Sequence, residues 1–176
     1  METSELRLNT VHDYLGRVNL TGEIKDYYEG RTILVTGGAG AIGSNLVTAL
    51  SHLVGDEGTI IVLDNLSAIK GDDPIDLPPL GNMLFVKGDI RSDSDLKRVF
   101  REKPSIVFHL AAFFANQNSV DYPETSADVD INGIIKLLDL SQFTQVEKFV
   151  YASSGCAIYG SYGKMPLTED FISLHL

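Results

Sequence analysis

The sequence TILVTGGAGAIGSN, residues 32–45, decides the fold of this chain. Residues 32–36 are apolar or β-branched throughout, which is typical of a strand covered on both faces of a parallel sheet. A glycine-rich turn follows at 37–43, and helical sequence runs over 42–53 until Gly55 ends it. Strand, glycine turn and helix in this order predict the first βαβ unit of an α/β protein.

The remaining sequence continues this alternation of strands and helices. We predict four further strands, at residues 59–63, 83–86, 105–109 and 147–152. The longer helices predicted between them cover residues 93–101 and 123–142. Right-handed crossovers then produce a Rossmann-type, doubly wound parallel sheet of five strands in the order 3-2-1-4-5. Ligands of such sheets bind beyond the carboxyl ends of the strands, where the strand order reverses.

The glycines of the turn are spaced for phosphate binding. Gly37 permits a tight turn, Gly40 lets the backbone approach a pyrophosphate, and Gly43 lets helix and strand pack closely. The helix that begins here directs free N–H groups and a partial positive charge at the anion. A glycine turn that serves packing alone is the less favoured alternative.

Two aspartates end the next two strands. Asp64 follows the second strand and is placed to accept hydrogen bonds from both hydroxyls of an adenosine ribose. Its charge repels a 2′-phosphate, and no Arg occurs in residues 65–67, so the sequence favours NAD over NADP. Asp89 follows the third strand, where it either meets the adenine amino group or serves as a turn and capping residue.

Composition excludes several other classes of protein. The 176 residues carry 14 Lys and Arg against 24 Asp and Glu, a net charge of −10, which argues against nucleic-acid binding. A single Cys excludes a disulfide framework and a Cys-based zinc site, and we expect no metal. The longest apolar run, 106–115, is shorter than the roughly 20 residues of a membrane span. No signal-peptide pattern opens the chain, so a cytoplasmic location is expected.

Residues 1–30 differ in character from the domain predicted at 31–176. They are polar, with Leu8, Val11 and Leu15 at helical spacing. We therefore predict an N-terminal helical arm that docks on its own NAD-binding domain, in preference to an arm that contacts a partner.

Five segments carry a family resemblance. They are TGGAGAIGSN at 36–45, DNLS at 64–67, GDIR at 88–91, HLAA at 109–112 and YASSGCAIYG at 151–160. In this order and spacing the chain resembles the extended short-chain dehydrogenase/reductases, the NAD-dependent nucleotide-sugar epimerase/dehydratase group. The resemblance implies a tightly held NAD, a nucleoside-diphosphate (NDP) sugar substrate, and hydride transfer through a keto-sugar intermediate. It also implies a homodimer, formed partly through the helix after the fourth strand.

The resemblance assigns cofactor-binding roles to individual positions. From the pyrophosphate loop through ribose and adenine to the nicotinamide, these are Gly37, Gly40, Ala41, Ile42, Gly43, Asp64, Asn65, Asp89, Ile90, Leu110, Ala111, Ala112 and Ser153. His109 ends a buried strand, and we predict a structural role for it.

Three positions depart from the family pattern. Gly155 occupies the place of the usual Ser or Thr that binds the reacting sugar hydroxyl, so this catalytic role is either absent or taken by Ser154. Asp130 replaces an Asn, and Phe114 replaces a Lys that epimerases often carry. These departures indicate a divergent subfamily.

The family's catalytic Tyr-x-x-x-Lys motif does not occur in the 176 residues. We therefore expect the chain to be the N-terminal portion of a longer enzyme, to stop before the sixth strand and the substrate domain, and to be inactive alone. Two alternatives remain open, a non-catalytic NAD-binding module and a reductase of the same fold that acts on an NDP-sugar.

Overall fold

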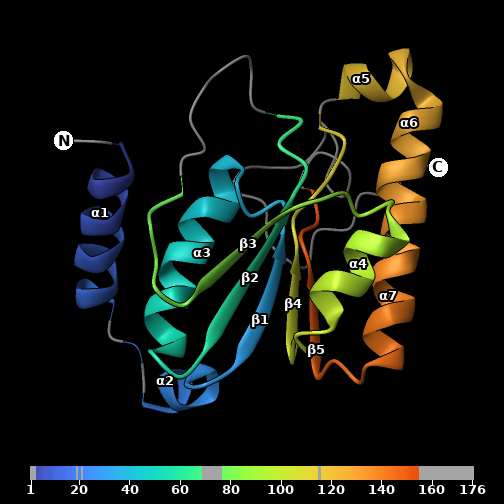
Figure 1. Cartoon of the computed structure of the whole chain (residues 1–176). Helices are drawn as coiled ribbons and strands as arrows, with labels where there is room; N and C mark the ends of the chain where they lie inside the picture. The colour runs from blue at the N-terminus through green and yellow to red at the C-terminus, as the bar shows by residue number, and fades with distance from the viewer. Residues whose placement is uncertain (1–2, 19, 21, 69–76, 115, 155–176) are drawn as a thin grey trace, which may run out of the picture.

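A computed structural model describes residues 3–18, 20, 22–68, 77–114 and 116–154. It contains one parallel sheet with the strand order β3-β2-β1-β4-β5 (Figure 1), which confirms the predicted fold class and topology. The strands are β1 (Thr32–Thr36), β2 (Thr59–Asp64), β3 (Met83–Lys87), β4 (Ile106–His109) and β5 (Lys148–Tyr151). The helical segments are α1 (Thr3–Arg17), α2 (Gly22–Tyr28), α3 (Ala41–Val54), α4 (Asp93–Phe100), α5 (Asn116–Asp121), α6 (Pro123–Ala127), the π-helix η1 (Asp128–Gly133) and α7 (Ile134–Phe143).

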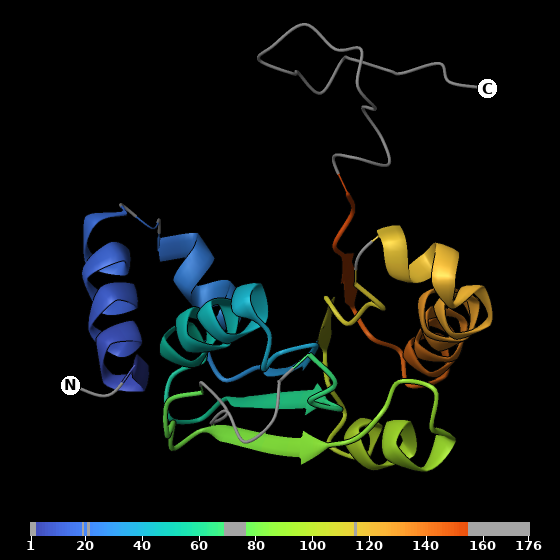
Figure 2. The same cartoon turned by 90° about the horizontal axis from the view of Figure 1, so that it is seen from above.

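Helices cover both faces of the sheet, with α3 on one side and α4 and α7 on the other (Figures 1 and 2). Leu34 in β1 is paired with Ile61 of β2 and Val107 of β4, and all three are fully buried. Their face of the sheet packs on the helix residues Leu96, Val99, Phe100 and Leu137. The opposite face packs on Val47, Leu50 and Val54 of α3. Burial on both faces explains why β1 and β2 have no polar residue in their centres.

The N-terminal arm forms two helices where the sequence pattern predicted one. Val11 of α1 is only 8% exposed, and the rings of His12 and His52 lie 5.2 Å apart, so α1 packs against α3. Figure 2 shows α1 outside α3, away from the sheet. The boundary between arm and domain at residue 30 stays a prediction.

The helix expected at 123–142 is not regular. It consists of α6, the π-helix η1 and α7 in direct succession, and the short helix α5 precedes it. A π-helix inserts an extra residue into one turn and often occurs at functional sites. Hydrophobic spacing cannot show such an insertion, because the apolar stripe continues on both sides of it. Within the described part of the chain, no helix is long and apolar enough to cross a membrane.

His109 at the end of β4 is buried, with 2% of its surface exposed. Its Nδ1 lies 2.7 Å from the Thr36 hydroxyl oxygen, and its ring stacks on Tyr151 at 5.5 Å. The Thr36 oxygen also accepts a hydrogen bond from Ala111 N, which leaves its own proton free for His109. Burial lowers the pKa of His109 from 6.5 to about 4, although Asp130 opposes the shift. His109 is therefore neutral at pH 7 and bonded within the core.

The stability of the fold should fall in acid because of His109. Between pH 6.5 and pH 4 the unfolded chain binds a proton at this ring that the folded chain does not. The free energy of unfolding should therefore decrease by up to about 3 kcal/mol across this window as the pH is lowered. Urea unfolding at a series of pH values measures the effect. The His109→Asn variant keeps an acceptor for Thr36 and should lose this part of the pH dependence; equal pH dependence in both proteins would contradict the assignment.

Candidate active site

The glycine turn brings the end of β1 against the loop that follows β4. Gly37 has a φ of +70°, and its N–H donates to the Leu63 carbonyl at 2.9 Å. A Cβ added at Gly37 would lie 2.7 Å from the backbone nitrogen of Ala111. The position therefore requires glycine for its backbone conformation, as the sequence pattern predicted, and also for space.

The start of α3 packs equally closely on the turn. A Cβ at Gly43 would lie 2.2 Å from the Gly37 carbonyl oxygen, so the first helical turn sits directly on the backbone of the glycine turn. Gly40 is the N-cap and supplies no side-chain hydrogen bond to the helix. Ala41 and Ile42 are exposed, Ile42 to 75%. A helix start without a side-chain cap leaves its N–H groups for an anion.

Asp64 is the last residue of β2 and lies beside this turn. Its Oδ2 accepts from Ala39 N at 2.9 Å and its Oδ1 accepts from Leu66 N at 2.8 Å. A carboxylate has about four lone-pair positions, so each oxygen keeps one for a further donor. The two backbone bonds orient the side chain and leave it able to receive two hydroxyl groups.

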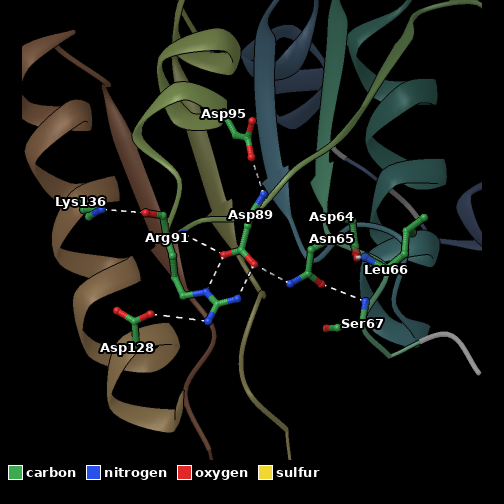
Figure 3. A network of polar contacts seen from close by, with 9 residues as sticks. All are labelled: Asp64, Asn65, Leu66, Ser67, Asp89, Arg91, Asp95, Asp128 and Lys136. Atoms are coloured by element: carbon green, nitrogen blue, oxygen red, sulfur yellow. Dashed lines mark hydrogen bonds and ion pairs between the residues drawn. The ribbon is translucent and has the colours of Figure 1, made fainter. Parts of the chain in front are cut away.

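The carboxylate of Asp89 already accepts four hydrogen bonds within the protein, which the sequence did not indicate. Its Oδ1 accepts from the backbone N and the Nε of Arg91, and its Oδ2 accepts from Arg91 Nη2 and from Asn65 Nδ2, at 2.9–3.0 Å (Figure 3). These bonds, above all those from Arg91, hold the pKa of Asp89 well below its ordinary value. With four donors in place, an adenine amino group could bind only by displacing one of them. The adenine contact predicted for Asp89 stays a prediction.

Arg91 connects this loop to the helix on the far side of the site. Its Nη1 lies 3.5 Å from Asp128 Oδ2, and its carbonyl accepts from Lys136 Nζ at 2.7 Å. Lys136 also pairs with Asp93 at 2.8 Å. Figure 3 shows this chain of contacts running from Asn65, next to Asp64, through Asp89 and Arg91 to Lys136 of α7. Sequence reasoning missed Arg91 and Lys136, although the GDIR segment contained the first of them.

The loop after β4 forms the other wall of the site. Leu110 and Ala111 are partly buried, and Ala112 is exposed. Asp130 Oδ1 accepts from Phe113 N at 2.8 Å, directly after this segment. The structure thus brings the glycine turn and Ala111 into contact and adds the side chain of Asp130 from η1, which the sequence did not indicate.

The predicted residues near the nicotinamide lie at the end of the described region. Ser153 and Ser154 are exposed and follow β5, whose exit is fixed by the bond from Ala152 N to the His109 carbonyl at 3.1 Å. Gly155 lies outside the described residues. Phe114 is 85% exposed. Among the residues described, no group of three or more His, Cys, Asp or Glu side chains could hold a metal ion.

Comparisons with known proteins agree with this geometry. The NAD dependent epimerase/dehydratase family matches residues 33–176. The UDP-glucose 4-epimerase of Mycolicibacterium smegmatis is 38% identical over 138 residues, which are 78% of this chain and 43% of the relative.

Solved structures show the same likeness. An epimerase from Methanothermobacter thermautotrophicus is 49% identical with a TM-score of 0.77, over 88% of this chain and 44% of the other. The UDP-glucose 4-epimerase of Thermus thermophilus, solved in complex with NAD, is 35% identical with a TM-score of 0.62, over 79% and 42%. The chain thus spans little more than two fifths of the length of these proteins.

The family match covers most of the chain and begins in the strand that precedes the glycine turn. The turn itself, the helix start behind it and Asp64 occupy the ligand-binding edge of a doubly wound sheet. This chain belongs to the NAD-dependent epimerase/dehydratase family.

Proposed function

We propose that this chain is the cofactor-binding part of a cytoplasmic, NAD-dependent nucleotide-sugar epimerase or dehydratase. One observation carries the proposal: the glycine turn has no room for a Cβ at Gly37 or Gly43 and opens a helix beside Asp64. Backbone this close to a helix start suits a pyrophosphate, and a carboxylate at the end of the next strand suits an unphosphorylated ribose.

The pyrophosphate and the adenosine ribose of NAD have suitable partners among these residues. The N–H groups at the start of α3, at Ala41 and Ile42, would meet the pyrophosphate. Asp64 would bind the two ribose hydroxyls through its two remaining lone pairs, because the bonds to Ala39 and Leu66 already hold its orientation. Leu110 and Ala112 would line the rest of the cleft, and Ile90, whose side chain is buried in the core, would take part through its backbone. Bound NAD supplies an acceptor, and later a donor, for one hydride of the sugar.

The chemistry beyond cofactor binding needs a base and a sugar site. We propose that Ser154 binds the reacting sugar hydroxyl, since it is exposed after β5 beside Ser153. The base would be a Tyr-x-x-x-Lys pair from sequence outside these 176 residues. We place the base there because the relatives are more than twice as long as the part that matches this chain. On this proposal the present chain holds and orients the cofactor but does not complete the reaction.

A non-catalytic NAD-binding module is the second candidate. It is favoured by Gly155, which cannot supply the usual hydroxyl, and by the lack of the Tyr-x-x-x-Lys motif within the sequence. A reductase acting on an NDP-sugar would use the same cofactor site, so it differs only in the fate of the hydride.

We further propose that the protein forms a homodimer through η1 and α7. Ile131, Ile135 and Leu138 follow one another at helical spacing and are 57%, 48% and 44% exposed. This apolar stripe lies on the side of the helix turned away from the core residue Leu137. A second copy of the same helix would cover it.

Cofactor titration tests the first part of the proposal. By calorimetry the chain should bind NAD more tightly than NADP, because Asp64 repels the 2′-phosphate. Asp64→Asn should weaken NAD binding about tenfold or more and reduce the preference over NADP, since a charged acceptor is lost. Asp139→Asn, an exposed carboxylate on α7, removes the same charge and should change neither value. Tighter binding of NADP by the unaltered chain would contradict the role of Asp64.

Turnover separates the enzyme from the binding module. The 176-residue chain loaded with NAD should show no UDP-glucose-dependent change in the absorbance of reduced cofactor and should form no epimer. The gene sequence downstream of Leu176 should encode a Tyr-x-x-x-Lys motif, and a protein that includes it should turn over an NDP-sugar. A downstream sequence without this motif would favour the non-catalytic module.

Sedimentation velocity tests the dimer. The unaltered chain should associate with rising concentration, and Ile135→Glu should remain monomeric because a charge at the centre of the stripe opposes its burial. Leu84→Glu alters an apolar residue of similar exposure, 39%, on β3 and serves as the control. The η1–α7 interface would be rejected if both variants sedimented like the unaltered chain.

A further inference from the structure

The π-helix η1 contacts both loops that border the cofactor cleft. Asp128 at its start pairs with Arg91, in the loop after β3. A Cβ at Gly133, its last residue, would lie 2.7 Å from Ile90 Cδ1, in the same loop. Between them, Asp130 bonds to Phe113, in the loop after β4. The π-helix therefore touches the loop with the predicted adenine residues and the loop that is predicted to line the cofactor cleft.

Asp130 uses both of its carboxylate oxygens. Oδ1 accepts from Phe113 N at 2.8 Å, and Oδ2 accepts from Ser126 Oγ, one turn earlier on α6, at 2.9 Å. The bond to Ser126 fixes the rotation of the carboxylate, so the oxygen that meets Phe113 is held in place. Asp130, Phe113 and Ser126 are all partly buried, and this strengthens both hydrogen bonds relative to bonds in open water.

The segment from Ala111 to Phe113 is held at its two ends. At its start, Ala111 N donates to Thr36 Oγ1 at 3.4 Å, and Ala111 lies against the Cα of Gly37 with no space for a side chain between them. At its end, Phe113 N is bonded to Asp130. Between the two lies Ala112, which is exposed toward solvent. Leu110 N also donates to the Thr36 carbonyl at 3.1 Å, so the start of this wall is tied to β1. Asp130 is the tie to η1 at its other end.

We infer that Asp130 is a positioning residue for NAD binding, acting through the backbone of Phe113 on the wall formed by Leu110–Ala112. This inference rests on the proposed NAD site. It gives a role to Asp130, which stands where the family pattern usually has an Asn. Either side chain can accept from Phe113 N; with Asn, the amide would donate to Ser126 instead of accepting from it.

Variants of Asp130 and Ser126 test this role, because they remove or keep the two hydrogen bonds separately. Asp130→Ala removes both bonds, Asp130→Asn keeps both, and Ser126→Ala removes only the bond that fixes the carboxylate. Asp139→Ala and Asp139→Asn on α7 are exposed matched controls for the loss of charge. For each protein, NAD affinity is measured by calorimetry, and hydrogen exchange of the Phe113 amide is measured by NMR without cofactor.

Asp130→Ala should weaken NAD binding about tenfold, equivalent to about 1.4 kcal/mol, and should speed exchange at the Phe113 amide. Asp130→Asn should restore both values to within about twofold of the unaltered chain, with Ser126→Ala between the two. A residue that only stabilises the fold would lower the melting temperature and leave the affinity of the folded protein unchanged.

Two results would overturn the inference: unchanged NAD affinity in Asp130→Ala, or an Asp130→Asn variant as weak as Asp130→Ala, which would show that charge matters and the hydrogen bonds do not. If Asp130→Ala does not fold, Ser126→Ala and the exchange rate of Phe113 decide in its place. Failure of the unaltered chain to bind NAD would instead reject the proposed function itself.

Discussion

The structure depends on one close approach of backbone to backbone, at the point where β1 turns into α3. The Gly37 carbonyl occupies the space of a Cβ at Gly43, and Ala111 occupies the space of a Cβ at Gly37. Three segments, the turn, the helix start and the loop after β4, therefore meet without side chains between them. Any side chain at these glycines would push the helix off the sheet or separate the two central strands, so the fold and the candidate site share one steric requirement.

This arrangement also explains how a chain with a net charge of −10 can present a site for a phosphate ligand. The donors are backbone N–H groups at a helix start, which do not depend on the surplus of Asp and Glu elsewhere. Acidic side chains near the site are each engaged: Asp64 by Ala39 and Leu66, and Asp89 by Arg91. Net charge is consequently a poor guide to ligand charge in folds that bind anions through the main chain.

The β1 strand, the glycine turn and Asp64 could be predicted from the sequence because their causes are local. The apolar residues of β1 must be buried, and the turn needs a glycine at position 37 because its φ is positive. Asp64 ends the neighbouring strand, so it lies at the same edge of the sheet as the glycine turn. The occupancy of Asp89 and the contact of Asp130 with Phe113 could not be predicted. Both depend on side chains from segments that are distant in the sequence. The contact of Asp130 also depends on the π-helix η1, which the hydrophobic spacing does not reveal. The N-terminal arm shows a third limit, since its apolar stripe did not reveal the break between α1 and α2.

Asp64 and Asp89 lie at the ends of neighbouring strands, and the sequence pattern assigned the first to a ribose and left the second open between an adenine contact and a turn. The structure separates them by the number of donors each already holds. Asp64 has two backbone donors and two free positions, so it is oriented for a ligand. Asp89 has four donors, three of them from Arg91, so it holds a loop together. Because Arg91 also reaches Asp128, a ligand that displaced the Arg91 side chain from Asp89 would act on η1 as well. The loop after β3 and the helical segments η1 and α7 are therefore parts of one hydrogen-bonded unit.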